Sequence, residues 1–176
     1  CRLRKYSSPV QARHLSNEIT NESFDNLLVA VERRAGIVRK YYQLKRRLLG
    51  VDKLYDYDRY APVEVKGVTV PASSWQEATE VVRASFHNFS SELGEIVDQF
   101  LSRRWVDAEI RPGKRGGAFC SATLPSVHPY ILLNFSGKLS DAMTLAHELG
   151  HGVHQFLARP KGILQVSTPL TLAETA

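Results

Sequence analysis

The chain has 176 residues, of which 43% are hydrophobic and 23% charged, a composition typical of a globular domain rather than of a disordered or collagen-like chain. No run of about 18 or more apolar residues occurs, and no apolar signal-peptide core follows the basic start, so we expect a cytoplasmic protein without a membrane partner. The two cysteines, Cys1 and Cys120, are too few for a disulfide scaffold and are expected to be reduced thiols.

The net charge of +5 lies unevenly along the chain. Residues 1–50 hold 11 basic and 4 acidic side chains, whereas the remainder is slightly acidic. A nucleic-acid site would need the positive charge on one face, but the basic residues here surround the expected helix: Arg33, Arg34, Arg39, Lys40, Lys45, Arg46 and Arg47. We therefore expect no nucleic-acid partner, and a basic helical nucleic-acid binder is a weaker alternative.

The first half of the chain is expected to be helical. Apolar residues recur every three or four positions before Gly50, which follows where a left-handed cap is favoured. Ser74 and Glu77 have the spacing of a capping box. These signals predict helices over residues 21–49, 74–87 and 91–104, with a connecting segment and a brief strand in residues 51–73.

In the second half, helical periodicity gives way to short β-prone runs separated by a turn-rich segment. We expect a sheet of two or three strands over residues 106–110, 118–121 and 130–135. Ser140-Asp141 offers an N-cap for a helix over residues 142–158. Thr168 as N-cap, with Pro169 at the first helical position, predicts a last helix from Leu170 onward.

One short motif carries most of the functional information. His147-Glu148-Leu149-Gly150-His151 has the H-E-x-x-H pattern and falls within an expected helix. Its two histidines are one turn apart on the same face, so both imidazoles can reach one zinc ion. Glu148 lies about 100° round the helix, where it can meet a water molecule without binding the metal.

A catalytic zinc site needs a third protein ligand. The metzincin pattern would place glycine at position 154 and histidine at position 157, but the chain has His154 and Leu157. If the third ligand lies downstream, Glu174 is the only strong candidate, because no other Asp, Glu, His or Cys follows His154. His154 itself is expected either to make a supporting hydrogen bond or to serve in packing. Gly150 and Gly152 lower helix propensity, which indicates close approach by a ligand, an ion or a backbone.

The motif belongs to a longer set of recognisable runs. It continues as Gly152-Val153-His154-Gln155, and the runs Gly162-Ile163-Leu164-Gln165 and Thr168-Pro169-Leu170-Thr171-Leu172-Ala173-Glu174 follow. Upstream runs include Tyr41-Tyr42-Gln43-Leu44-Lys45-Arg46-Arg47-Leu48-Leu49-Gly50, Gly113-Lys114-Arg115-Gly116-Gly117-Ala118-Phe119 and His128-Pro129-Tyr130-Ile131-Leu132-Leu133-Asn134. Taken together, the chain closely resembles the oligopeptidase F branch of the thimet-type metallopeptidases.

The resemblance implies a mainly helical zinc endopeptidase of the cytoplasm, with a small sheet beside a deep channel and short peptides as substrates. At the matching positions it assigns the metal ligands and the catalytic glutamate: His147, His151 and Glu174 for the metal, and Glu148 for catalysis. Zinc held in this way is expected to activate water, with Glu148 as the general base.

In that family the strand before the zinc helix is thought to pair with an extended peptide. Gly117, Ala118 and Phe119 fit this use, because glycine permits close approach of another backbone. An ordinary strand entered through a flexible turn explains the same residues equally well, so both interpretations remain open.

We therefore predict a mainly α protein with a small β-sheet, of the α+β class, in which a zincin-type helix lies beside the sheet. Residues 1–104 are expected to form a helical region, and residues 105–176 the sheet, the zinc helix and the start of the third-ligand helix. Members of the resembled family run to several hundred residues, so the chain is expected to be part of a larger helical peptidase. The alternative is an inactive fragment that serves as a packing or interaction module. The sequence does not predict the oligomeric state.

Overall fold

The computed structural model describes residues 2–63 and 73–175. The chain divides into two compact units, Cys1–Thr69 and Val70–Ala176, which are described separately. The predicted domains, residues 1–104 and 105–176, remain a prediction. The brief strand expected in residues 51–73 falls mostly outside the described residues, and residues 51–63 contain a 3-10 turn instead.

The first unit is built around one long helix. Its elements are η1 (Arg2–Arg4), α1 (Gln11–Ser16), α2 (Asn21–Leu49) and η2 (Asp56–Tyr60). The predicted bounds of α2 are confirmed. The Thr20 hydroxyl accepts a hydrogen bond from the Ser23 N–H at 3.0 Å, and Gly50 ends the helix with a left-handed φ of 67°.

Within this unit, α2 leaves most of its apolar side chains exposed: Leu27, Leu28, Val31, Ile37, Val38, Tyr41, Leu44 and Leu48. The buried side chain of α2 is instead that of Lys45, whose ammonium donates to the main-chain oxygen of Arg59 at 2.7 Å. This bond ties the segment around η2 to the end of the long helix.

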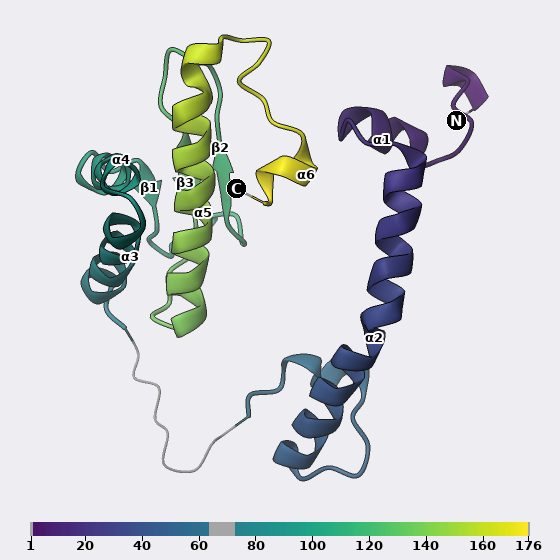
Figure 1. The fold of residues 1–176 in the computed structure, drawn as a ribbon. Helices are drawn as coiled ribbons and strands as arrows, with labels where there is room; N and C mark the ends of the chain where they lie inside the picture. Colours follow the sequence, from purple (N-terminus) through teal and green to yellow (C-terminus); the bar gives the residue numbers. More distant parts are fainter. Residues whose placement is uncertain (1, 64–72, 176) are drawn as a thin grey trace. The chain divides into compact units, whose positions relative to one another are not determined.

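The second unit combines four helices with a small sheet (Figure 1). Its helices are α3 (Trp75–Phe89), α4 (Ser91–Ser102), α5 (Leu139–Ala158) and α6 (Leu170–Ala173), with the 3-10 turn η3 (Arg159–Lys161). Its strands are β1 (Val106–Asp107), β2 (Phe119–Ser121) and β3 (Tyr130–Leu132), in the order β1-β3-β2. β1 is parallel to β3, and β2 is antiparallel to β3, so β2 is an edge strand. The predicted α+β fold class is confirmed.

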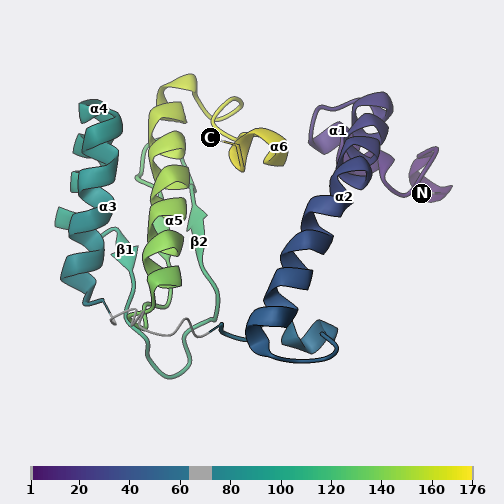
Figure 2. The ribbon, with the colours of Figure 1, turned by 60° about the horizontal axis from the view of Figure 1, so that its bottom comes forward.

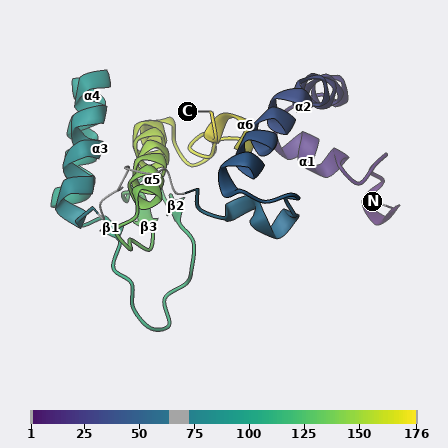
Figure 3. The same cartoon turned by 90° about the horizontal axis from the view of Figure 1, so that it is seen from below.

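Helix α5 is the centre of this unit. In Figure 2 it runs beside β2, and Figure 3, which views it nearly end-on, shows α3 and α4 on one side and β2 and α6 on the other. Its buried residues Leu145, Leu149 and Val153 join the core with residues from α4 and β3, among them Phe100 and Ile131. The motif helix is therefore anchored on both sides.

Several predicted ends differ from the structure. Helix α5 begins at Leu139 rather than at residue 142, because Asp141 caps the helix from its first turn by accepting from the Lys138 N–H at 3.1 Å. Helix α6 has no side-chain cap, so the predicted role of Thr168 as N-cap is wrong. Across residues 2–63 and 73–175, no helix is both long and apolar enough to cross a membrane.

Candidate metal and catalytic site

Three metal-type donors, two from α5 and one directly after α6, meet at the surface of the second unit. His147 and His151 project from the same face of α5, and their Nε2 atoms lie 3.0 Å apart. Oε2 of Glu174 lies 3.6 Å from Nε2 of His147 and 3.7 Å from Nε2 of His151. The structure thus brings together the three residues that the sequence named as metal ligands.

The two histidines and the carboxylate are held with different firmness. Both imidazoles project from the long packed helix α5 at i, i+4 spacing, and the side chain is 15% exposed for His151 and 55% exposed for His147. Glu174 follows the four-residue helix α6 and is 53% exposed. A helix of this length has little stability of its own, so the carboxylate is less firmly held than donors on α5.

Glu148 lies about 100° round α5 from His147 and is buried, with 6% of its surface exposed. Burial raises the pKa of its carboxyl group, while the nearby histidines and a hydrogen bond from the Cys120 main-chain N–H act in the opposite direction. Its Oε2 atom is buried and has no hydrogen-bond partner among the described residues. Glu148 is therefore a poorly solvated carboxylate with one unused acceptor oxygen.

The edge strand β2 presents its main chain toward Glu148. The N–H of Ile131 in β3 donates to Trp105 at 3.0 Å, on the β1 side. Cys120 is the antiparallel partner of Ile131, so the N–H and C=O of Cys120 face away from β3, toward the open edge.

The same alternation assigns the neighbouring residues of β2. Phe119 pairs with Leu132 in β3, so its main chain is used inside the sheet. Extending the register by one residue places Ala118 opposite Leu133. The Leu133 N–H donates to the main-chain oxygen of Asp107, on the β1 side, so Leu133 does not pair with β2. The main-chain groups of Ala118 therefore face outward as well. Of the residues singled out for peptide pairing, Ala118 is at the open edge and Phe119 is not. Cys120 was missed because a main-chain contribution leaves no residue-type signal.

The Cys120 thiol is a half-buried group with a raised pKa. Burial, with a smaller contribution from the charge of Glu148, raises this pKa to about 12. Its sulfur lies 3.4 Å from Oε1 of Gln155 on α5. At neutral pH the side chain is a protonated, apolar packing group.

The two glycines of the motif helix have different surroundings. A β-carbon at Gly152 would lie 2.9 Å from two ring carbons of Phe100 and 3.2 Å from Cδ1 of Ile131. A β-carbon at Gly150 would meet nothing within 4 Å. Close approach at Gly152 is therefore made by the hydrophobic core rather than by a ligand or an ion.

Residues 1–176 match the sequence pattern of Peptidase family M3. The chain belongs to this family. It is 32% identical to oligopeptidase PepF of Bacillus subtilis (strain 168) over 159 residues, which cover 90% of this chain and 23% of that protein. It is 33% identical to an oligoendopeptidase F homologue of Borreliella burgdorferi, covering 89% of this chain and 26% of the relative. The predicted resemblance to oligopeptidase F is confirmed.

Solved structures agree with this assignment. A putative peptidase from Chlamydophila abortus superimposes with a TM-score of 0.75 at 30% identity, over 98% of this chain and 29% of that one. PZ peptidase A with inhibitor 2 superimposes with a TM-score of 0.74 at 25% identity, over 90% of this chain and 29% of that one. The chain thus spans about a quarter of the length of the proteins it matches.

Two cavities flank the donor cluster in this M3 chain. One, of about 390 Å³, extends from the end of β2 past His151 and His154. The other, of about 550 Å³, is lined mainly by apolar residues of α3, α4 and α5 and includes His147 and Gly150. The polar partner of His154 is the Thr168 hydroxyl, 3.5 Å from Nε2, rather than a member of the cluster.

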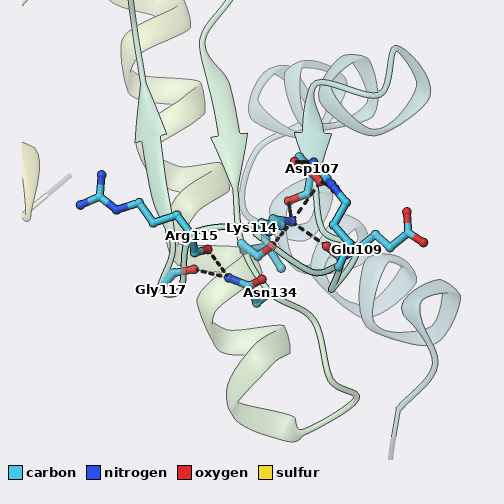
Figure 4. A network of polar contacts seen from close by, with 8 residues as sticks. Asp107, Glu109, Lys114, Arg115, Gly117 and Asn134 are labelled. Carbon is cyan, nitrogen blue, oxygen red and sulfur yellow. Dashed lines mark hydrogen bonds and ion pairs between the residues drawn. The ribbon is translucent and has the colours of Figure 1, made fainter.

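A buried lysine holds the turn that leads into β2 (Figure 4). The Lys114 side chain is 3% exposed. Its ammonium lies 2.7–3.0 Å from four oxygens: the main-chain oxygens of Asp107, Glu109 and Leu133, and Oδ1 of Asp107. The Asn134 amide donates to the main-chain oxygens of Arg115 and Gly117, each at 3.0 Å. We call Lys114 and Asn134, with these bonds, the turn clamp.

Proposed function

We propose that this chain carries the metal-binding centre of a zinc-dependent peptidase that hydrolyses short oligopeptides. The observation that supports the proposal most directly is the convergence of His147, His151 and Glu174 next to the buried carboxylate of Glu148. Membership of a peptidase family, and relatives named as oligopeptidases, support the same reaction.

The donor set fits zinc in chemistry and in spacing. Imidazole nitrogen and carboxylate oxygen are preferred zinc donors, and two atoms that each bind zinc at about 2.0–2.2 Å are at most about 4.4 Å apart. The separations of 3.0, 3.6 and 3.7 Å all lie below this limit. His147 and Glu174 are both more than half exposed, and exposed ion pairs add little stability, so the fold does not need this cluster.

A zinc ion held by His147, His151 and Glu174 would supply Lewis acidity, which polarises a carbonyl and makes water a better nucleophile near neutral pH. Glu148 is suited to take the proton from that water and to return it to the leaving amine. Its burial raises the pKa, which strengthens it as a base, and its free Oε2 leaves an acceptor for the water.

The open edge of β2 is suited to bind the peptide. Ala118 and the Cys120 carbonyl present main-chain groups that β3 does not use, so an extended peptide can add to the sheet there. The cavities of about 390 and 550 Å³ on the two sides of the cluster offer room for its side chains. Main-chain pairing is independent of side-chain identity, which suits an enzyme acting on varied short peptides.

The test compares Glu148→Gln with wild type in the natural polypeptide that contains these residues. We expect the variant to keep its zinc and to cleave a fluorogenic oligopeptide about 10²- to 10⁴-fold more slowly, the usual contribution of a general base. Glu109→Gln is the matched control, because Glu109 is exposed and its side chain points away from the turn clamp (Figure 4). It should cleave at the wild-type rate.

Two results would contradict the proposal. If Glu148→Gln hydrolyses the peptide at the wild-type rate, Glu148 is not the general base. If the variant loses its zinc, Glu148 is a metal ligand. Zinc content, measured by atomic absorption, therefore accompanies each rate.

A further inference from the structure

Arg115 is a positively charged residue at the beginning of the open β2 edge. It lies three residues before Ala118 and is exposed. Among residues 73–175 it forms no ion pair, and its recorded side-chain contact is with the Phe119 ring, 5.8 Å from the guanidinium carbon. In Figure 4 its side chain points away from Lys114 and Asn134. The guanidinium is therefore free to bind an anion.

The main chain beneath this guanidinium is fixed. The main-chain oxygen of Arg115 accepts from the Asn134 amide, and the residue before it is the buried Lys114 of the turn clamp. Gly117, two residues later, is held by the same Asn134 amide. An anchored arginine loses less conformational freedom on binding than one on a loose turn, so the clamp prepares Arg115 for a ligand.

Charge then decides the direction of a peptide paired with β2. In the antiparallel direction, the C-terminal half of the peptide lies opposite Gly117 and Ala118, next to Arg115. In the parallel direction, the N-terminal half and its positive α-amino group would lie there instead. Antiparallel pairing is also slightly more stable per residue, so both terms favour the antiparallel arrangement.

We propose that Arg115 binds the C-terminal carboxylate of a short peptide paired antiparallel with β2, and so selects for peptides that end close to the cleaved bond. The inference rests on the proposed peptidase function. We take Cys120 as the cleavage position, because its thiol lies 3.4 Å from Oε1 of Gln155, one turn after His151 on α5. With a strand rise of about 3.3 Å per residue, the carboxylate would come within reach of Arg115 about two or three residues after the cleaved bond. A guanidinium pairs with a carboxylate through two parallel hydrogen bonds.

The experiment uses the natural polypeptide that contains these residues and a series of fluorogenic peptides with two to six residues after the cleaved bond. Each peptide is made with a free C-terminal carboxylate and with a C-terminal amide. We expect wild type to prefer the free acid about tenfold at two or three residues, through KM rather than kcat, and to lose this preference in the longer peptides.

Arg115→Gln should abolish the preference, and Arg115→Lys should keep part of it because the charge remains. Arg104→Gln is the matched control, since Arg104 is an exposed arginine before β1, at the opposite edge of the sheet. It should behave as wild type. A second readout without turnover is the Kd of the acid and the amide for the Glu148→Gln variant, with and without Arg115→Gln.

The outcomes separate this inference from the proposed function. Equal KM values for acid and amide in wild type, or a preference that survives Arg115→Gln, would overturn the role of Arg115 while leaving the peptidase intact. Failure to cleave or bind any of the peptides would overturn the proposed function, and the role of Arg115 with it. Thermal unfolding of Arg115→Gln should match wild type, because the side chain is exposed.

Discussion

Gly152 of α5 packs directly on the aromatic ring of Phe100 in α4. A β-carbon at this glycine would lie 2.9 Å from Cε1 and from Cζ of the ring, closer than side-chain carbons tolerate. Phe100 is fully buried and contacts the rings of Trp105 and Phe156, so it cannot simply move aside. The contact fixes the distance between the motif helix and the helix behind it.

Gly152→Ala should therefore destabilise the protein by about 1–3 kcal/mol, the usual cost of overpacking a core. Gly150→Ala is the matched control, because its β-carbon meets nothing within 4 Å. It should be neutral or stabilise the helix by up to about 1 kcal/mol. Urea unfolding of both variants measures the difference, and equal stabilities would contradict the packing account.

Lys114→Met should also destabilise the second unit. The substitution keeps an apolar stem but leaves the main-chain oxygens of Asp107, Glu109 and Leu133 without this donor. Losing a buried charged donor costs about 2–4 kcal/mol. The control is Lys161→Met, at an exposed position of the same unit, which should change the unfolding free energy little. A similar loss in both variants would argue against the turn clamp.

Acid should weaken the same region through Asp107. Hydrogen bonds from Arg111, and next from Lys114, hold the pKa of this carboxyl well below its usual value. A depressed pKa in the folded state stabilises the fold above the unfolded pKa of about 3.9, and this contribution is lost as the pH falls below that value. The carboxylate is partly exposed, so solvent screening keeps the effect modest.

Asp107→Asn should accordingly be less stable than wild type at neutral pH and should lose less stability between about pH 4 and pH 2. Glu95→Gln, at an exposed residue of α4, should follow the wild-type pH dependence. Unfolding free energies at several pH values give both curves. Parallel curves for wild type and Asp107→Asn would exclude a role for this carboxylate.

Zinc affinity should depend unequally on the three proposed ligands. His147→Ala and His151→Ala should each weaken zinc binding by more than about 100-fold. A loss of about 100-fold is the most expected for a residue that only supports a ligand without binding the metal itself. Glu174→Gln should cost less, because its carboxylate follows a four-residue helix and is poorly preorganised. His154→Ala should bind zinc as wild type does, since its polar partner is Thr168.

Competition with a fluorescent chelator measures these affinities in the 176-residue chain itself. A loss in His154→Ala as large as that in Glu174→Gln would assign His154 a supporting role at the metal. Unchanged binding in His147→Ala would remove the proposed site.

The sequence predicted the elements whose signals are local. Gly50 ends α2 in the left-handed conformation expected of it, and the capping box of Ser74 and Glu77 opens α3, with the Glu77 carboxylate accepting from the Ser74 N–H at 2.8 Å. The two histidines are four residues apart, so predicting a helix was enough to predict that they share one face. The start of α5 was misjudged because an aspartate can cap a helix either as the N-cap residue or from the third helical position. Asp141 does the second, and apolar periodicity does not distinguish the two.

Features formed by distant segments were not predictable in this way. Lys114 is buried because its acceptors come from segments before the turn and after β3. No spacing pattern in the sequence predicts that these segments contact one lysine. The outward direction of Cys120 depends on which neighbour β3 pairs with on its other side. The place of Glu174 beside α5 was expected only from the absence of other candidates and from the family resemblance.

The contribution of residue 120 that lowers the pKa of Glu148 comes from its main-chain N–H, which every amino acid except proline carries. Evolution can therefore exchange the side chain here for any small group that fits beside Gln155, without disturbing the carboxylate. A survey that scores importance by side-chain identity would rank the position as dispensable. Proline scanning would find it, because only the imino acid removes the donor while leaving the volume nearly unchanged.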